Sequence, residues 1–326
     1  MSFFLKNAGN GKLLYKQDFS ESDFINGYQC NTYTVDLPFG KAETTQWCIE
    51  GIRLLYTEAL FNKPATLEWN GDTGMVTQFF NLKGQLSISN NENNLPPGLS
   101  GNQHNIFYSN GANGQLNVEE LEMKWFMVQL TKHAFLKLSC TANAAFKRFT
   151  DAVSDGEPTV FSDNNLLIDF EIRNCINQII HCPYADELKP MFLLSKVMEL
   201  LVLQADSYQR ARTVTSRVLK TEYDYERIIF AREYLLKNMD VPPSLTELAL
   251  IAGINEFKLK KGFKETFNQS VFQYLSNTRL ETARIYLLEG SKTPTELAFE
   301  LGYSSLQHFS TAFKKKFGVP PNRVRR

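Results

Sequence analysis

The sequence has little cysteine and no long hydrophobic run, and both absences exclude classes of protein. The five cysteines among 326 residues are scattered and never have a C-x-x-C spacing. This excludes a disulfide framework and a four-cysteine zinc site, and it favours reduced thiols. The most apolar stretch, residues 191–203, contains Ser195, Lys196 and Glu199 and is too short to cross a bilayer. Residues 1–6 lack the features of a signal peptide, so we expect a cytoplasmic protein with no membrane partner.

An excess of charge of one sign is also absent, since 35 basic side chains balance 35 acidic ones. The two parts of the chain differ, however. Residues 222–326 hold 16 basic and 12 acidic side chains, whereas residues 1–221 hold 19 basic and 23 acidic ones. Positive charge is therefore concentrated in the C-terminal part, as contacts with phosphates require. Lysine runs are also common on ordinary solvated surfaces, so the function must be argued from motifs.

Histidine is scarce as well. The chain has four histidines, and two of them, His104 and His133, are isolated within the N-terminal part. The sequence contains no His-x-His pair and no closely spaced set of carboxylates of the kind that holds a metal in a β-barrel. We therefore expect neither a metal ion nor a cofactor.

The most informative feature that is present is an internal repeat in residues 244–326. Thr-Glu-Leu-Ala followed by a glycine occurs at residues 246–249 with Gly253 and again at residues 295–298 with Gly302, an offset of 49. Beyond the glycines the offset becomes 50, and these residues match in pairs: Leu259 and Phe309, Phe263 and Phe313, Lys264 and Lys314, Phe267 and Phe317. Each copy has the pattern of a short apolar helix, a glycine turn at positive φ and a second helix. The repeat predicts two helix-turn-helix motifs.

A single helix is expected to join the two motifs. Residues 271–288 contain an apolar stripe without proline or glycine, and Gly290 marks its end. At about 1.5 Å per residue such a helix is roughly 27 Å long. It would hold the two motifs about one DNA turn, near 34 Å, apart. Adjacent major grooves on one face of DNA are therefore the expected target.

The second helix of each motif is the expected DNA-reading element, because this helix enters the major groove in helix-turn-helix proteins. Its outward side chains carry amide, hydroxyl and ammonium groups that suit bases and phosphates. We expect DNA contacts from Asn255, Phe257, Lys258, Lys260, Lys261 and Lys264 in the first motif, and from Ser304, Ser305, Gln307, His308, Ser310, Thr311 and Lys314 in the second.

Over residues 222–326 the chain resembles the AraC/XylS-type transcription regulators. The resemblance is carried by Leu248-Ala249, Gly253, Leu259, Gly262-Phe263-Lys264, Phe267, Tyr274, Arg279, Ala283, Leu287-Leu288, Leu297-Ala298, residues 301–305, Phe309, Phe313-Lys314-Lys315, Phe317-Gly318 and Pro320-Pro321. It implies an all-helical domain that binds double-stranded DNA and recruits or blocks RNA polymerase. Carried over by position, base contacts fall on Phe257, Lys260, Lys261, Gln307, His308, Ser310 and Thr311. Two residues depart from the family pattern: Asn268 replaces a common glycine, and Thr311 replaces a common long basic side chain.

The N-terminal part is expected to be antiparallel β structure up to about residue 140. Segments rich in β-branched and aromatic residues occur at 32–35, 47–56, 65–69, 75–80, 85–89 and 122–129. This pattern is typical of a sandwich or small barrel, and the resemblance implies a cupin-like sensor. The three tryptophans all lie here, and we expect Trp47, Trp69 and Trp125 to line an effector cavity, although aromatic residues more often form ordinary core.

Helical periodicity begins at about residue 164. It predicts one helix that ends before residues 181–184 and a second from Leu188 to Gln204, whose wide apolar surface would pack on the barrel or form a homodimer. Residues 182–201 and 258–264 also resemble the siderophore-responsive branch of the family, which implies a ferric siderophore as effector. The expected architecture is α+β and multidomain: a sensing domain over 1–205, a linker over 206–222 and a DNA-binding domain over 223–326.

Two functions fit these observations, and a third does not. The first is a sequence-specific transcription regulator, in the family often an activator, controlled by a small-molecule effector in the N-terminal domain. The second is a constitutive or non-specific DNA-binding protein with a structural N-terminal domain. The third is an alkyl-transfer repair enzyme with the same DNA-binding part, but its reactive Pro-Cys-His-Arg setting and four-cysteine metal site are absent. We therefore do not expect an enzyme.

Overall fold

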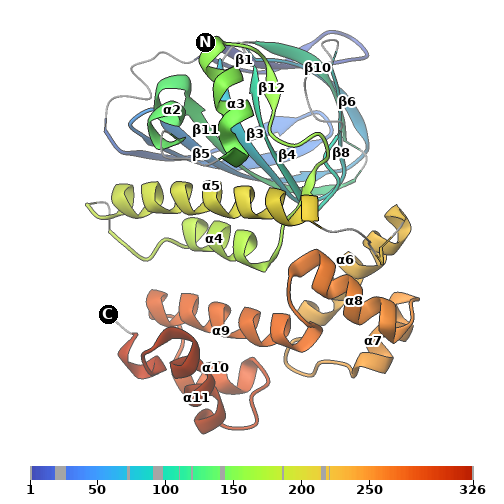
Figure 1. Ribbon diagram of the computed structural model, residues 1–326, viewed down its shortest axis with the longest axis vertical. Coiled ribbons are helices and arrows are strands. Elements are labelled where there is room, and N and C mark those ends of the chain that lie inside the picture. Colours follow the sequence, from blue (N-terminus) through green and yellow to red (C-terminus); the bar gives the residue numbers. More distant parts are fainter. Residues whose placement is uncertain are drawn as a thin grey trace. The chain divides into compact units, whose positions relative to one another are not determined.

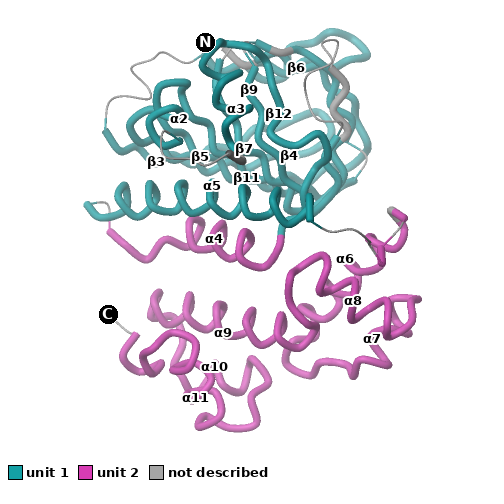
Figure 2. The backbone as a smooth tube through the Cα atoms, viewed as in Figure 1, with its two compact units in different colours: residues 1–168, 186–213 teal, residues 169–185, 214–326 magenta. Residues whose placement is uncertain are grey.

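The computed structural model describes residues 2–18, 27–71, 74–90, 98–109, 111–118, 120–139, 144–185, 187–213, 218–219 and 221–324. The chain divides into two compact units (Figures 1 and 2). Unit 1 comprises residues 1–168 and 186–213, and unit 2 comprises residues 169–185 and 214–326. The expected sensing domain over residues 1–205 included residues 169–185, which group with unit 2.

Unit 1 is built from two antiparallel sheets. The smaller has the strand order β2-β1-β6-β10-β8, and the larger has the order β12-β9-β7-β11-β5-β4-β3, with β13 paired to β9. The strands are β1 (Ser2–Asn7), β2 (Leu13–Asp18), β3 (Gln29–Leu37), β4 (Gly40–Ile49), β5 (Ile52–Phe61), β6 (Ala65–Gly71), β7 (Met75–Lys83), β8 (Leu86–Asn90), β9 (Gln103–Ser109), β10 (Ala112–Val118), β11 (Glu122–Thr131), β12 (Thr159–Val160) and β13 (Leu166–Leu167). The predicted antiparallel β structure is confirmed.

Several strands differ from the sequence-based expectation. The segment 47–56, expected as one strand, is a hairpin in which Glu50 and Gly51 form the turn between β4 and β5. Both turn residues have positive φ, 34° and 84°, as the common two-residue hairpin turns require. The prediction was wrong because apolar residues lie on both sides of this turn, which hid it. Strands β1, β2, β9, β10, β12 and β13 were not predicted.

Three longer helices accompany these sheets: α2 (Lys132–Ser139), α3 (Ala144–Asp155) and α5 (Lys189–Thr213). Helices α2 and α3 were not predicted. Helix α5 extends beyond the expected end near Gln204, so residues 206–213 of the expected linker are helical. The buried side of α5 packs against the large sheet, where Nε2 of Gln204 lies 3.0 Å from Nδ1 of His104 on β9. Burial lowers the pKa of His104 to about 3, so this contact is formed by a neutral imidazole.

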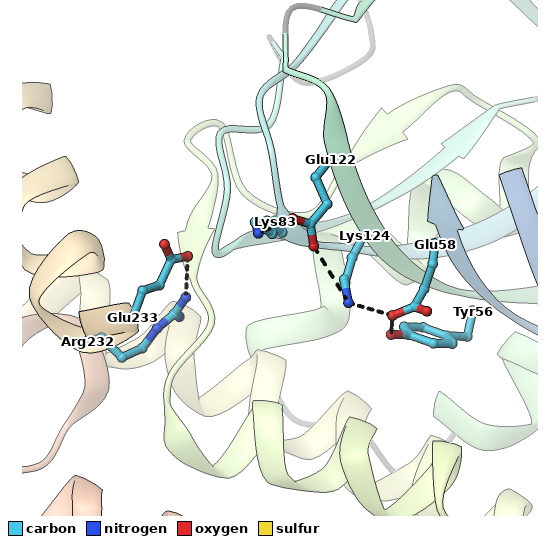
Figure 3. Close-up of polar contacts among 7 residues, drawn as sticks. All are labelled: Tyr56, Glu58, Lys83, Glu122, Lys124, Arg232 and Glu233. Carbon is cyan, nitrogen blue, oxygen red and sulfur yellow. Dashed lines mark hydrogen bonds and ion pairs between the residues drawn. The ribbon is translucent and has the colours of Figure 1, made fainter. Parts of the chain in front are cut away.

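The outward face of the large sheet carries a chain of polar contacts (Figure 3). Lys83 on β7 contacts Glu122 on β11 at 2.5 Å, and Lys124 contacts Glu58 on β5 at 2.6 Å. The hydroxyl of Tyr56 donates to Glu58 at 2.6 Å. Successive side chains of a strand point to opposite faces. The neighbours of these residues along β11 and β5 therefore point toward the interior of unit 1.

Unit 2 is helical. It contains α4 (Phe170–Ile180), α6 (Glu222–Lys237), α7 (Leu245–Ala252), α8 (Glu256–Phe267), α9 (Val271–Glu289), α10 (Pro294–Glu300), α11 (Leu306–Phe317) and the short η1 (Pro321–Arg323). Helix α4 begins two residues after Ile168, which the periodicity had placed inside it, and it ends before His181 as expected. No helix in the described parts of the chain has the length and hydropathy needed to cross a membrane.

Two hydrophobic clusters form the core of unit 2. The first collects α6, α7, α8, the start of α9 and Phe170 of α4 around Phe263 and Tyr274. The second collects the rest of α9 with α10 and α11 around Phe309 and Phe313. Met239, in the loop after α6, packs against both clusters. Each cluster therefore supports one repeat of the sequence.

Candidate functional site

The first repeat folds as α7, a turn at Gly253 and α8. Ser244 and Glu247 close a capping box at the start of α7, an arrangement that satisfies two backbone N–H groups that would otherwise lack a partner. Gly253 ends the helix in the left-handed conformation, with φ 68°. Leu259 and Phe263 of α8 are fully buried. The opposite side of α8 is consequently turned toward solvent.

The second repeat has the same local structure in α10, the turn at Gly302 and α11. Thr293 and Glu296 form the capping box, and Gly302 has φ 71°. Phe309 and Phe313 are buried as their counterparts are in α8. Helices α8 and α11 begin at residues 256 and 306. The change of offset from 49 to 50 is therefore one extra residue between the turn glycine and the second helix.

Helix α9 joins the two motifs without interruption. It begins after Ser270, whose hydroxyl accepts a hydrogen bond from the Gln273 amide, and it ends at Gly290 with φ 68°. Leu275 faces the first cluster, while Ala283 and Leu287 face the second. The predicted connecting helix is confirmed, and its two ends are anchored in different cores.

Most of the expected DNA-binding residues lie on the exposed sides of α8 and α11. The exposed ones are Asn255, Phe257, Lys260, Lys261, Lys264, Ser304, Gln307, His308, Thr311 and Lys314. Lys258, Ser305 and Ser310 are half-buried. Phe257 is 63 % exposed, which is unusual for a phenylalanine that nothing covers. The geometry thus presents two similar polar surfaces, one on each motif.

Some of these side chains already have partners within unit 2. Lys258 contacts Asp224 of α6 at 2.7 Å, and Lys260 contacts Glu256 at 2.8 Å. Asn255 and Ser305 cap α8 and α11 by accepting backbone hydrogen bonds. These four contacts position the helices, and they leave Lys261 as a lysine of the first motif for which the described residues show no ion pair. The sequence did not reveal the pairing of Lys258, because it depends on α6 bringing Asp224 near, whereas the pair of Lys260 and Glu256 is local to α8.

A second candidate site is a cavity of about 280 Å³ inside unit 1, lined by both sheets. This is near the lower end of the range for small-molecule sites, roughly 300–1,000 Å³. Of the three tryptophans expected there, Trp69 and Trp125 line the cavity. Trp47 is 4 % exposed and lies in the core outside the lining, because its side chain is on the other face of β4.

The cavity has a polar region that the sequence reading missed. Arg53 of β5 is 5 % exposed and lines it, donating from Nε to Oε1 of Gln129 at 2.8 Å. The rings of Tyr15 and Tyr33 stack with centroids 6.4 Å apart. A charged residue inside the apolar segment Ile52-Arg53-Leu54-Leu55 was the available signal. In a strand of period two, Arg53 shares its face with Leu55 and Thr57.

The paired motifs on one connecting helix define a DNA-binding helix-turn-helix protein, and comparison with known families agrees. A helix-turn-helix domain family matches residues 248–326, and the family described as the regulatory protein PchR N-terminal domain matches residues 45–219. The chain belongs to the AraC-type transcription regulators that carry this PchR-type N-terminal domain. This is a family of regulators and not of enzymes.

Individual relatives match about a third of the chain. Regulatory protein PchR of Pseudomonas aeruginosa is 34% identical over 113 residues, 35% of this chain and 38% of PchR. The bifunctional transcriptional activator/DNA repair enzyme AdaA of Bacillus subtilis is 29% identical over 102 residues, 31% of this chain and 48% of AdaA. The chain therefore spans less than half the length of these relatives. The C-terminal domain of AraT, a response regulator from Geobacillus stearothermophilus, is 32% identical, with 31% of this chain and 84% of that chain covered and a TM-score of 0.29.

Proposed function

We propose that this protein is a sequence-specific regulator of transcription that reads double-stranded DNA with α8 and α11 and is controlled by a small molecule bound in unit 1. The observation that carries the proposal is the pair of matched motifs, each with an exposed second helix, on one continuous helix α9. Two recognition helices on one rigid connector suit successive major grooves on one face of DNA.

Specific reading is tested against non-specific binding. A DNA sequence selected from a random library should bind at least about a thousandfold more tightly than a scrambled sequence of the same composition at one fixed salt concentration. Equal affinity for both, with a steep dependence on salt, would favour the alternative of a constitutive or non-specific binder with a structural unit 1.

Effector control is supported by the cavity in unit 1 and by the match of residues 45–219 to a regulatory domain. The ligand would favour one arrangement of the protein and so change how both motifs meet DNA. A ferric siderophore is the first candidate, because residues 182–201 and 258–264 resemble the siderophore-responsive branch. Gel-shift titrations with and without candidate effectors test this, and a DNA affinity that no effector changes would contradict it.

Helix α5 is the proposed homodimer surface. Its side formed by Leu193, Val197 and Leu200 is buried, whereas Met191 and Val202 are 73 % and 67 % exposed. An exposed apolar row on a surface helix is typical of an association surface. Light scattering should show a dimer that Met191→Ser with Val202→Ser converts to a monomer. A monomeric wild-type protein at micromolar concentration would reject this part.

RNA polymerase is the proposed protein partner, with activation as the outcome. Leu250 of α7 and Phe299 of α10 occupy equivalent positions on the first helices of the repeat and are 81 % and 65 % exposed. Leu250→Ser and Phe299→Ser should leave DNA affinity unchanged and reduce transcription in a reconstituted assay. Unchanged transcription would remove these residues from the contact.

A further inference from the structure

The N-terminal half of α11 has to read DNA without a lysine or an arginine. Residues 306–311 contain neither, and the N-terminal residues of a recognition helix are the ones that contact base edges. Within this segment Gln307 and His308 are exposed and carry N–H groups of the kind that reads bases. The orientation of these two side chains therefore decides much of what α11 can read.

The ring of His308 is held by a serine of the same motif. Oγ of Ser304 lies 2.7 Å from Nδ1 of His308, and both residues are exposed. The backbone is fixed at the same point, because the hydroxyl of Ser305 accepts a hydrogen bond from the His308 amide at 3.2 Å. Two successive serines thus hold the backbone and the ring of one residue at the start of the recognition helix.

The first motif uses the equivalent positions differently. Counted from the helix caps, Lys258 is the counterpart of His308, and Ile254 is the counterpart of Ser304. Ile254 packs against the first hydrophobic cluster, and the ammonium group of Lys258 contacts Asp224 of α6 at 2.7 Å. The helix-turn-helix fold therefore does not require the contact between His308 and Ser304, which is a feature of the second motif.

The contact at Nδ1 determines what the other ring nitrogen can do. In a neutral imidazole one nitrogen donates and the other accepts, and the hydrogen bond at one nitrogen sets the role of the other. When the Ser304 hydroxyl donates to Nδ1, the ring proton lies on Nε2, the nitrogen farther from the backbone. Within the described part of the chain, Nδ1 is the ring nitrogen of His308 that has a partner. Nε2 is therefore available to DNA as a donor.

We propose that Ser304 is a positioning residue that holds His308 as an Nε2–H donor, and that His308 donates to N7 of a guanine in the half-site bound by α11. The inference rests on the proposed function, because it names a base and the residue that reads it. In the major groove guanine presents two neighbouring acceptors, N7 and O6. Adenine places an amino donor beside N7, thymine places a methyl group beside O4, and cytosine presents an amino donor. A single N–H donor therefore favours guanine.

The test uses the full chain and the DNA that it selects from a random library. Each guanine of the selected DNA is replaced in turn by 7-deazaguanine, which keeps Watson–Crick pairing and lacks the N7 acceptor. We expect one replacement to weaken wild-type binding by about threefold to tenfold, the effect of one hydrogen bond. The same replacement should have no effect on the binding of His308→Ala, because the donor is already missing.

Ser304 is tested by removing and restoring its hydroxyl. Ser304→Ala should reduce the penalty of 7-deazaguanine to about twofold or less, and Ser304→Thr, which keeps a hydroxyl, should restore it. Ser291→Ala is the matched control, because Ser291 is exposed and its hydroxyl donates to the Tyr286 carbonyl outside both motifs. With 15N-labelled histidine, NMR at about pH 8 should show the ring proton of His308 on Nε2. Far-UV circular dichroism checks that each variant is folded.

Four results would overturn the inference: no guanine at which 7-deazaguanine weakens binding, a penalty that persists in His308→Ala, a full penalty in Ser304→Ala, or a ring proton on Nδ1. The preference of the wild type for selected over scrambled DNA is measured on the same preparation. If that preference is present but no guanine depends on His308, only this inference fails. If the preference is absent, the proposed function fails together with it.

Discussion

The two helix-turn-helix motifs have the same sequence pattern, but different neighbours hold them. The first motif packs against a whole helix, α6, and Gly262 in the middle of α8 makes this contact close: a Cβ there would lie 2.5 Å from Cδ1 of Ile228. The corresponding residue of α11 is Ala312, which packs on the second core. A glycine inside a helix lowers the stability of that helix. Gly262 is nevertheless explained here, because a side chain would collide with Ile228 of α6.

The second motif is held instead by the loop that follows α6. Nε of Arg279 on α9 donates to the carbonyl of Met239 at 2.8 Å, and a Cβ on Gly302 would lie 2.0 Å from the carbonyl oxygen of Asp240. A Cβ on Gly253 would meet nothing within 4 Å. Gly253 therefore only allows the left-handed turn, whereas Gly302 allows the turn and also leaves room for the backbone of Asp240. Residues that match in a sequence repeat can thus have different structural roles.

The largest expected difference between the motifs is in their turn glycines. Gly253→Ala should lower the free energy of unfolding of unit 2 by about 1–2 kcal/mol, the cost of a left-handed alanine. Gly302→Ala adds the collision with Asp240 and should cost about 2–5 kcal/mol. Urea unfolding followed by far-UV circular dichroism measures both. Tryptophan fluorescence, which reports only unit 1, is the internal control. Equal losses for the two variants would contradict the difference in packing.

Removing the arginine that braces the second motif should have the next largest effect. Arg279→Met keeps most of the side-chain volume but loses the hydrogen bonds to Met239, at a cost of about 1–2 kcal/mol. Because the brace fixes one motif against the other, affinity for DNA with both half-sites should fall more than affinity for a single half-site. Comparing gel-shift affinities for the two DNAs checks this, and a uniform loss on both would mean that the brace stabilises only the fold.

Substitutions of two lysines of α8 should distinguish a residue that contacts DNA from one that positions the helix. Lys261→Ala should reduce DNA affinity by roughly 1–3 kcal/mol with little change in stability. Lys258→Ala, which breaks the contact with the mostly buried Asp224, should lower stability more than affinity. A loss for Lys261→Ala that is equal on every DNA sequence, with the salt slope reduced by about 1, would make Lys261 a phosphate contact.

The smallest expected effect is a gain at the second motif. Thr311 is exposed on α11, whose N-terminal half has no lysine or arginine. Thr311→Arg should raise DNA affinity by about tenfold or less and steepen the salt slope by about 1, because a new cation releases counterions. Thr311→Gln is the uncharged control of similar length. If neither affinity nor slope changes, α11 does not approach DNA at this position.

Prediction from sequence succeeded where the signal is local. The periodic residues of 245–317 gave both motifs and the connecting helix, since side chains three and four residues apart share one face of a helix. It failed where partners are distant in sequence. Strands β1 and β2 pair within a sheet that is completed by β6, β10 and β8, which lie much later in the sequence. The short alternation of polar and apolar residues in β1 and β2 is a weak signal for a strand.

The candidate sites divide in the same way. The outward positions of α8 and α11 followed from helical spacing, but the pairing of Lys258 with Asp224 did not. Trp69 and Trp125 line the cavity and Trp47 does not. Successive residues of each strand point to opposite faces of the sheet, and the sequence does not show which face borders the cavity.

The sequence by itself determined that two helix-turn-helix motifs stand on one helix, because caps, turn glycines and apolar spacing act within a few residues. Only the tertiary structure decided which lysines of α8 have an ion-pair partner, that a side chain on Gly302 would collide with Asp240, and that Arg53 lies in a mostly apolar cavity. Those properties depend on contacts between segments that the chain brings together only when it folds, with burial setting their energy.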